Sequence, residues 1–145
     1  MRCSTEPWRD DVSVNSDATP PGIRQQVTWV YTRDLDDTCR FYAGLLGLSL
    51  VLDQGSCRIF RAATGAFIGV CRARPGREVA PAGVVITLVS DDVDGWYEHL
   101  RAAGAAIEAP PHRSEAFNVY SFFVLDPNGY RVEIQAFLDP TWPAT

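Results

Sequence analysis

Apolar and polar residues follow the same order in two stretches of this chain. Residues 27–48 begin with an apolar run, pass through an acidic turn at Asp34 and continue as an amphipathic segment that ends near a glycine. Residues 85–107 repeat this order with Asp92 at the turn, about 58 residues later, counted from position 27 to position 85. The pattern predicts two strand–helix units. We expect a ligand site between these halves.

The first half contains one expected helix and four expected strands. Asp34 or Asp36 can cap the helix, and acidic residues are favourable in its first turn. Its apolar side recurs at three- and four-residue spacing, at Leu35, Cys39, Tyr42 and Leu46. We expect strands at residues 26–32, 48–52, 57–62 and 66–72, followed by a linker rich in Pro and Gly at 74–83.

The strands at 57–62 and 66–72 predict a hairpin. A three-residue loop at 63–65 places Gly65 where a left-handed residue is needed. This register sets Cys57 opposite Cys71, and opposed Cα atoms about 4.5–5.5 Å apart are within disulfide range. The two cysteines either fill the sheet as small apolar residues or form a redox or thiol-ligand pair. No CxxC motif occurs, so zinc-knuckle spacing is absent.

The second half predicts the same elements. We expect a strand at 84–89, a helix at about 93–103, a short strand at 105–108 and a loop at 109–114. A hairpin of residues 119–125 and 130–137 surrounds Asp126-Pro-Asn-Gly129, where Pro presets φ and Asn-Gly supplies left-handed positions. The apolar side of the helix carries Val93, Trp96, Tyr97 and Leu100.

Length and composition favour one domain. The 145 residues divide into an N-terminal arm at 1–22, a domain at 23–139 with modules at about 24–73 and 83–138, and a tail at 140–145. No apolar run is long enough for a membrane helix, and the N-terminus lacks a secretory pattern. We therefore expect a cytoplasmic protein with reduced thiols. The net charge of −5 argues against nucleic acid as a partner.

The order β-α-β-β-β in each half predicts an α+β fold. Two such modules laid edge to edge form a curved eight-stranded mixed sheet, with helices outside and a cleft inside. The segments DLDDTCRFYAGLLGL, DDVDGWYEHLRAAGA and DPNGYRVEIQ resemble the vicinal oxygen chelate superfamily of glyoxalases, bleomycin-resistance proteins and extradiol dioxygenases. The resemblance covers about Gln26 to Asp139. It implies this fold, a small-molecule ligand and a homodimer, for which Trp8 and Trp142 are candidate contacts.

The resemblance also provides a test for a metal site. In metal-using members, the first strand of each half carries His or Gln about seven residues before the Asp of the turn, and a last strand carries a carboxylate. Here those first-strand positions hold Val27, with Gln26 one residue earlier, and Val85; only Glu133 matches the carboxylate. A divalent ion needs about three or four ligands. We therefore expect no cofactor; the alternative is a divalent metal held by Gln26 and Glu133.

Alternation along the last strand separates a polar face from an apolar one. Arg131, Glu133 and Gln135 share the polar face, which the resemblance turns toward the cleft; the alternative is a solvated edge. With the strands oriented as the resemblance implies, Trp29 and Tyr31 point into the cleft and form its aromatic walls. The alternative is that they pack in the core or in a dimer contact. The remaining candidate ligand-binding residues are Arg58, Phe60, Phe117, Asn118 and Tyr120.

These features predict a metal-independent small-molecule-binding protein whose ligand is planar or cationic. The alternative is a divalent-metal-dependent lyase, isomerase or dioxygenase with Glu133 as a metal ligand. A third hypothesis is a metal-free enzyme in which Glu133 is the catalytic base, since burial raises a carboxylate pKa toward the working range. The sequence leaves open whether any reaction is catalysed. His99 and His112 are expected to be exposed.

Overall fold

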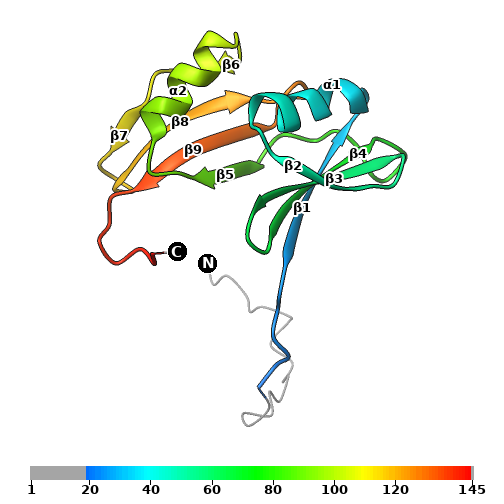
Figure 1. Cartoon of the computed structure of the whole chain (residues 1–145), viewed down its shortest axis with the longest axis horizontal. Helices are drawn as coiled ribbons and strands as arrows, with labels where there is room; N and C mark the ends of the chain where they lie inside the picture. Colours follow the sequence, from blue (N-terminus) through cyan, green and yellow to red (C-terminus); the bar gives the residue numbers. More distant parts are fainter. Residues whose placement is uncertain (1–18, 145) are drawn as a thin grey trace, which may run out of the picture.

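The computed structural model describes residues 19–144 and contains two βαβββ modules (Figure 1). Most of the expected arm, with Trp8, lies outside the described residues. The first module has a four-stranded sheet in the order β1-β4-β3-β2, in which β1 and β4 are parallel. Its elements are β1 (Gln26–Thr32), α1 (Leu35–Cys39), the π-helical segment η1 (Arg40–Leu45), β2 (Ser49–Asp53), β3 (Cys57–Ala63) and β4 (Ala66–Arg72).

The second module repeats this order with one additional strand. Its sheet follows the order β5-β9-β8-β6, and β7 pairs with β8. The predicted loop at 109–114 was wrong in part, because residues 112–114 form β7. Its elements are β5 (Val85–Val89), α2 (Val93–Ala102), β6 (Ala106–Ile107), β7 (His112–Ser114), β8 (Val119–Leu125) and β9 (Arg131–Phe137).

The α+β fold of two βαβββ modules is confirmed, with β7 as an additional strand. Backbone pairing places the nine described strands in two sheets rather than in one sheet of eight. The sheets have four and five strands, and β1 and β5 each lie at the end of a sheet's pairing order. Figure 1 shows the sheets side by side, with α1 and η1 over one and α2 over the other. In residues 19–144 no helix is long and apolar enough to cross a membrane.

The first helix forms as its polar and apolar positions predict. The Asp34 carboxylate accepts a hydrogen bond from the Asp37 backbone N–H at 3.0 Å, which caps the N-terminus. The expected apolar stripe is buried, including Leu35 and Tyr42 at 1% and 0% exposure. The helix widens into η1, and Gly47 follows it with φ of +66°. This stripe is the main packing surface for the first sheet.

The β3–β4 hairpin has the predicted cysteine pairing but a different turn. Ala63 pairs with Ala66, so the loop has two residues rather than three. A register shift between Arg61 and Ala63 compensates for the shorter loop, and Cys57 still pairs with Cys71. The two cysteines form a disulfide, with Cα atoms 4.1 Å apart. The expectation of reduced thiols was therefore wrong at these two positions.

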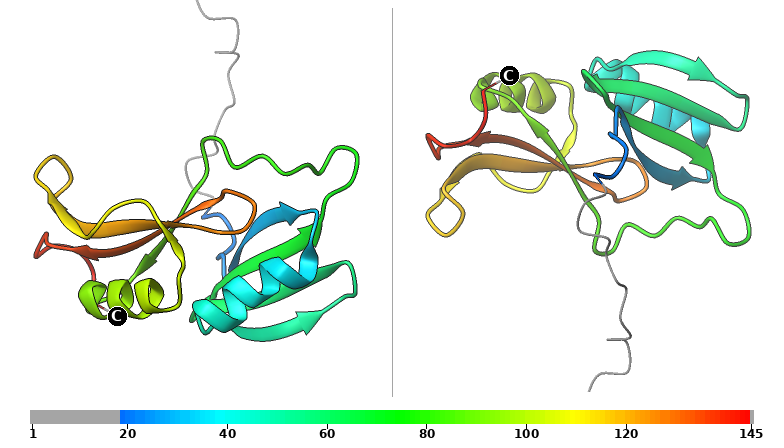
Figure 2. Two further views of the ribbon diagram at one scale, coloured as in Figure 1. Left: turned by 90° about the horizontal axis from the view of Figure 1, so that it is seen from above. Right: turned by 90° about the horizontal axis from the view of Figure 1, so that it is seen from below.

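The two modules are joined by the β8–β9 turn. Figure 2 shows this hairpin end beside β1 of the first module. The buried Tyr42 hydroxyl donates to Asp126 Oδ2 at 2.9 Å, across the boundary between the modules. Asp126 Oδ1 also accepts from the backbone N–H groups of Asn128 and Tyr130, at 2.8 and 2.9 Å. The Asp126 carboxylate thus shapes its own turn and binds the other module.

Further hydrogen bonds extend this junction. Thr32 Oγ1 donates to Asn128 Oδ1 at 2.8 Å, and Asn128 Nδ2 donates to Thr38 Oγ1 at 2.9 Å. Both threonines are fully buried. The Tyr130 hydroxyl accepts from the Tyr31 backbone N–H at 3.3 Å. Because buried polar groups are costly without partners, this satisfied network favours one relative placement of the modules.

Apolar packing connects the same elements. One hydrophobic cluster contains Tyr42, Leu46 and Phe60 from the first module and Leu100 and Phe122 from the second. The C-terminal tail folds back on the second module, where Trp142 stacks on Phe137 of β9. Trp142 remains half exposed, and its role in a homodimer stays a prediction. The modules therefore share one core.

Replacing Tyr42 by Phe tests the junction. The change removes the hydroxyl that donates to Asp126 and leaves the ring in the core. Burial and the nearby Asp126 carboxylate raise the pKa of Tyr42 well above its usual range, so the hydroxyl is a donor at all ordinary pH values. We expect the free energy of unfolding to fall by about 1.5–3 kcal/mol, measured by urea denaturation.

Tyr97→Phe is the control for this experiment. Tyr97 packs against Phe122 on the helix side of the second sheet, and among the described residues its hydroxyl has no hydrogen-bond partner. Its loss should change the free energy of unfolding by less than about 0.5 kcal/mol. Equal effects of the two substitutions would contradict the role given to the Tyr42–Asp126 bond.

Candidate functional site

The helix-free face of the second sheet presents polar and aromatic side chains in ordered rows. Alternation along β9 points Val132 and Ile134 at the core and Glu133 and Gln135 at the opposite face. Strand pairing aligns Phe123, Glu133 and Thr87 across three strands. The neighbouring row contains His112, Ser121 and Gln135. The predicted orientation of Glu133 and Gln135 agrees with this arrangement.

Glu133 is held in place by its neighbours. Thr87 Oγ1 donates to Glu133 Oε2 at 2.9 Å. With the Gln135 amide oriented so that its nitrogen faces Glu133, the nitrogen lies 3.0 and 3.3 Å from the two carboxylate oxygens. Gln135 is itself buried, at 7% exposure. The carboxylate is therefore fixed in orientation by two neutral donors, while its charge has no neutralising contact from either of them.

Arg131 lies on the same face of the sheet as Glu133 but forms its ion pair with Glu108. Its guanidinium donates to both carboxylate oxygens of Glu108, each at 2.8 Å, and its Cζ atom lies 3.9 Å from the centre of the Phe123 ring. This contact lowers the pKa of Glu108. Within the described residues Glu133 forms no ion pair at a distance of 4.0 Å or less. The charge of Glu133 thus remains available to a ligand.

The helix-free face of the second sheet contains a hollow of about 670 Å³, which Glu133 lines. Its polar lining comes from Glu133, Gln135, Thr87, Ser121 and His112. Its aromatic lining comes from Phe117, Phe123 and Phe137, of which Phe117 is 80% exposed. A volume of this size suits a small organic molecule. The site can combine one carboxylate, several hydrogen-bonding groups and three aromatic surfaces.

The sequence missed several residues of this hollow. Thr87 and Ser121 are the polar members of strands whose other residues are mostly apolar, and their contribution follows from the pairing order. His112 was expected to be exposed on a loop; it is exposed, lies in β7 and lines the hollow. A three-residue strand after two prolines has too short a pattern to reveal which way its side chains point.

Trp29 and Tyr31 lie on the helix-free face of the first sheet, as predicted, but line a different hollow. This second hollow has a volume of about 600 Å³ and includes the Cys57–Cys71 disulfide. The Trp29 ring lies across Gly69, where an added Cβ would be 2.2 Å from Trp29 Cε3. The predicted aromatic residues and Glu133 are therefore not gathered in one cleft, since each module forms its own hollow.

The predictions for Arg58 and Phe60 as cleft residues were wrong. Both point to the helix side of the first sheet, because Cys57 occupies the opposite face and side chains alternate along β3. Phe60 is 1% exposed and stacks with Tyr42 in the core. Arg58 donates to Asp36 at 2.8 Å and to Asp53 at 3.2 Å, rather than to Glu133. Its guanidinium lowers the pKa of Asp36.

Of the three candidates Phe117, Asn118 and Tyr120, only Phe117 lines the hollow. Tyr120 points to the helix side, where its hydroxyl donates to Asp94 of α2, so its assignment to the cleft was wrong. The Asp94 carboxylate raises the pKa of that hydroxyl. Asn118 adopts a positive φ of 51° and accepts a hydrogen bond from Arg113 at 3.4 Å. It is a turn residue rather than part of the lining.

Gln26 and Glu133, the two candidate metal ligands, are not placed to bind the same ion. Gln26 lines a third hollow between the modules, of about 500 Å³, and its amide nitrogen donates to Thr28 Oγ1 at 2.7 Å. No bulge occurs along the β1–β4 pairing, so Gln26 stays on the opposite face from Trp29. Gln26 and Glu133 therefore line separate hollows. Within residues 19–144 no three His, Cys, Asp or Glu residues are grouped for metal binding.

A family model and solved structures of known proteins were compared with this chain, and they agree on one family. The model of the Glyoxalase/Bleomycin resistance protein/Dioxygenase superfamily matches residues 24–134. A lactoylglutathione lyase structure from Agrobacterium tumefaciens is 26% identical over 81% of this chain and 95% of its own, with a TM-score of 0.65. A glyoxalase/bleomycin resistance protein/dioxygenase structure from Nocardioides is 25% identical over 88% and 91%, with a TM-score of 0.66.

A lower-identity structure has the same fold. TioX from Micromonospora sp. ML1 is 22% identical over 79% of this chain and 98% of its own, with a TM-score of 0.66. No curated protein matches the chain.

Replacing Gly69 by Ala tests the placement of Trp29. The new methyl group would collide with the indole ring, which must move from the floor of the hollow. We expect the free energy of unfolding to fall by about 1–3 kcal/mol, measured by urea denaturation. Gly44→Ala is the control, because an added Cβ there meets no atom within 4 Å. That control should be neutral or stabilising by up to about 1 kcal/mol; a neutral Gly69→Ala would contradict the placement.

Proposed function

We propose that this chain, which belongs to the Glyoxalase/Bleomycin resistance protein/Dioxygenase superfamily, binds a planar organic cation without a metal. The proposed site is the hollow of about 670 Å³ on the second module. The observation that carries the proposal is the Glu133 carboxylate, which shares the hollow with three phenylalanines and has only neutral hydrogen-bond donors among its described neighbours.

Charge favours a cation in this hollow. The nearby Arg131 guanidinium forms its ion pair with Glu108 and interacts with Glu133 only at longer range. A cationic ligand would form a charge-assisted interaction with the carboxylate, and such interactions are stronger than neutral hydrogen bonds. An anion placed here would face Glu133 at close range. The local charge therefore selects against anions more clearly than the net charge of the whole chain does.

Shape and aromatic lining favour a planar ligand. Phe123 and Phe137 line the hollow from neighbouring strands, each with one ring face covered, by the Arg131 guanidinium and by Trp142 respectively. The exposed Phe117 lies on the turn that follows β7. Aromatic faces attract cations and stack with flat rings. Ser121, Gln135 and His112 add hydrogen-bonding groups that can fix the orientation of a heteroatom. These features support a binding role, and the metal-free base role of Glu133 is a separate hypothesis that predicts turnover insensitive to chelators.

A matched pair of ligands tests this proposal. N-methylquinolinium and quinoline are similar in shape, but at pH 8 only the first is charged. We expect wild-type protein to bind the cation at least tenfold more tightly, measured by calorimetric titration. Glu133→Gln should remove most of that preference, because loss of a charge-assisted interaction reduces affinity by about ten- to a hundredfold.

Glu98→Gln is the control variant. It also removes one negative charge, but Glu98 is on the surface of α2, where it pairs with Arg101. This variant should bind both compounds as the wild type does. Equal affinities of the wild type for the two compounds, or an unchanged preference in Glu133→Gln with retained fold, would reject the proposed cation site.

A further inference from the structure

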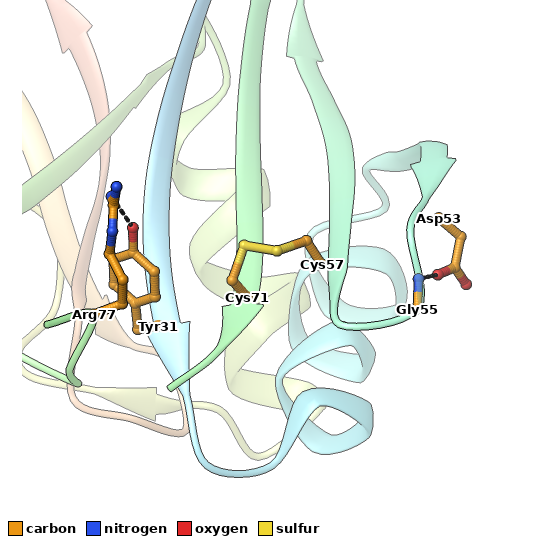
Figure 3. Close-up of a disulfide and its surroundings, with 6 residues drawn as sticks. All are labelled: Tyr31, Asp53, Gly55, Cys57, Cys71 and Arg77. Carbon is orange, nitrogen blue, oxygen red and sulfur yellow. Dashed lines mark hydrogen bonds between the residues drawn. A yellow bond between two sulfur atoms is a disulfide. The ribbon is translucent and has the colours of Figure 1, made fainter. Parts of the chain in front are cut away.

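The Cys57–Cys71 disulfide lies on the floor of the hollow on the first module. Strand pairing aligns Tyr31, Cys71 and Cys57 in one row across β1, β4 and β3. Figure 3 shows the disulfide beside Tyr31 and Arg77. Both cysteines line the hollow, where Cys57 is partly exposed and Cys71 is 8% exposed. The disulfide therefore faces a space that a small molecule can enter, with the Cys57 side more accessible.

Two arginines approach this hollow from one tight turn. Arg74 and Arg77 flank Pro75 and Gly76, and their backbones exchange hydrogen bonds of 3.0 and 2.8 Å. Gly76 has φ of +76°, as a turn with Pro at the preceding position requires. Both arginines line the hollow that contains the disulfide. Directly opposed like charges are unfavourable, and a bound anion would relieve this repulsion.

The guanidinium groups are positioned for an anion beside an aromatic surface. Arg77 Nη1 donates to the Tyr31 hydroxyl at 3.0 Å, which directs it toward the row that contains the disulfide. Within the described residues, neither Arg74 nor Arg77 has a carboxylate oxygen within 4.0 Å of its nitrogen atoms. Trp29, in the next row, provides an aromatic wall. The hollow thus combines positive charge, an aromatic wall and a cystine.

We propose that this hollow is a thiol–disulfide exchange site for small thiols that carry a carboxylate. The carboxylate docks on Arg74 and Arg77, and the thiolate attacks Sγ of Cys57, the more exposed of the two cysteines. A bond forms between the incoming sulfur and Cys57, while the bond to Cys71 breaks and its electron pair stays on Cys71 as a thiolate. This step leaves a mixed disulfide on Cys57.

A second thiol completes the reaction. Its thiolate attacks the sulfur of the bound thiol and releases a small-molecule disulfide, while Cys57 takes the electron pair. Two small thiols are thereby oxidised and the protein disulfide is reduced to two thiols, which take up the two protons. The site is separate from the proposed cation site, which lies on the other module. Either proposal can fail without affecting the other.

Reduction rates with three thiols test the charge selectivity of this site. The probes are 3-mercaptopropionate, 2-mercaptoethanol and cysteamine, which carry a negative, a neutral and a positive group. Each rate on the protein is divided by the rate on bis(2-hydroxyethyl) disulfide, which corrects for intrinsic reactivity. We expect the normalised rate for 3-mercaptopropionate to exceed that for cysteamine by roughly tenfold at low salt and to approach it at high salt.

Acid quenching and peptide mapping by mass spectrometry locate the adduct. We expect the mixed disulfide on Cys57, with Cys71 as the free thiol. The Arg74→Gln/Arg77→Gln variant should lose the charge preference. Arg40→Gln/Arg101→Gln is the matched control, since these arginines pair with Asp37 and Glu98 on the helices. It removes the same charge elsewhere and should retain the preference.

Four results would overturn the proposal. The first is a purified, unreduced protein in which Cys57 and Cys71 are free thiols. The second is an equal normalised rate for the three probes on the wild type, which requires no variant to fold. The third is an adduct confined to cysteines outside the disulfide, such as the buried Cys39. The fourth is unchanged selectivity in the Arg74→Gln/Arg77→Gln variant, which would show that these arginines do not hold the carboxylate.

Discussion

The buried hydrogen bond between Tyr42 and Asp126 connects the two modules, and the rest of the structure depends on this junction. Asp126 shapes the β8–β9 turn through two backbone N–H groups and accepts from Tyr42 of the other module. The same turn is the end of the hairpin that carries Glu133. A carboxylate buried at 4% exposure is costly without partners, so the modules must meet in the arrangement that satisfies it.

The two modules use the same scaffold to present different chemistry. Each sheet turns one face to its helix and leaves the other face open, and each open face is hollowed. The first carries the cystine, Trp29 and three arginines, whereas the second carries Glu133 and three phenylalanines. We therefore propose that the first hollow binds anions and the second binds cations. The two hollows have no lining residue in common, so their binding groups are independent although the modules share one core.

Local patterns in the sequence predicted the helices, most strands and the DPNG turn, whereas the faces of Trp29 and Glu133 were implied by the resemblance to the superfamily. Predictions failed where the position of a side chain depends on the neighbouring strand. Tyr31, Cys71 and Cys57 share a row, which places Arg58 on the helix side. Tyr120 pairs with Ala136, an apolar residue of the helix side. The alternation of residues within one strand does not show which residues of neighbouring strands lie beside them. The length of the β3–β4 turn was also missed, because the register shifts between Arg61 and Ala63.

The central claim is that this chain uses the superfamily scaffold to bind a ligand without a metal, since Gln26 and Glu133 line separate hollows. The most direct test is the divalent-metal content of untagged protein purified without chelators, measured by elemental analysis. We predict far less than one transition-metal ion per chain, and no shift in melting temperature when Zn²⁺, Ni²⁺ or Mn²⁺ is added. A near-stoichiometric ion that is lost in Glu133→Gln would contradict the account.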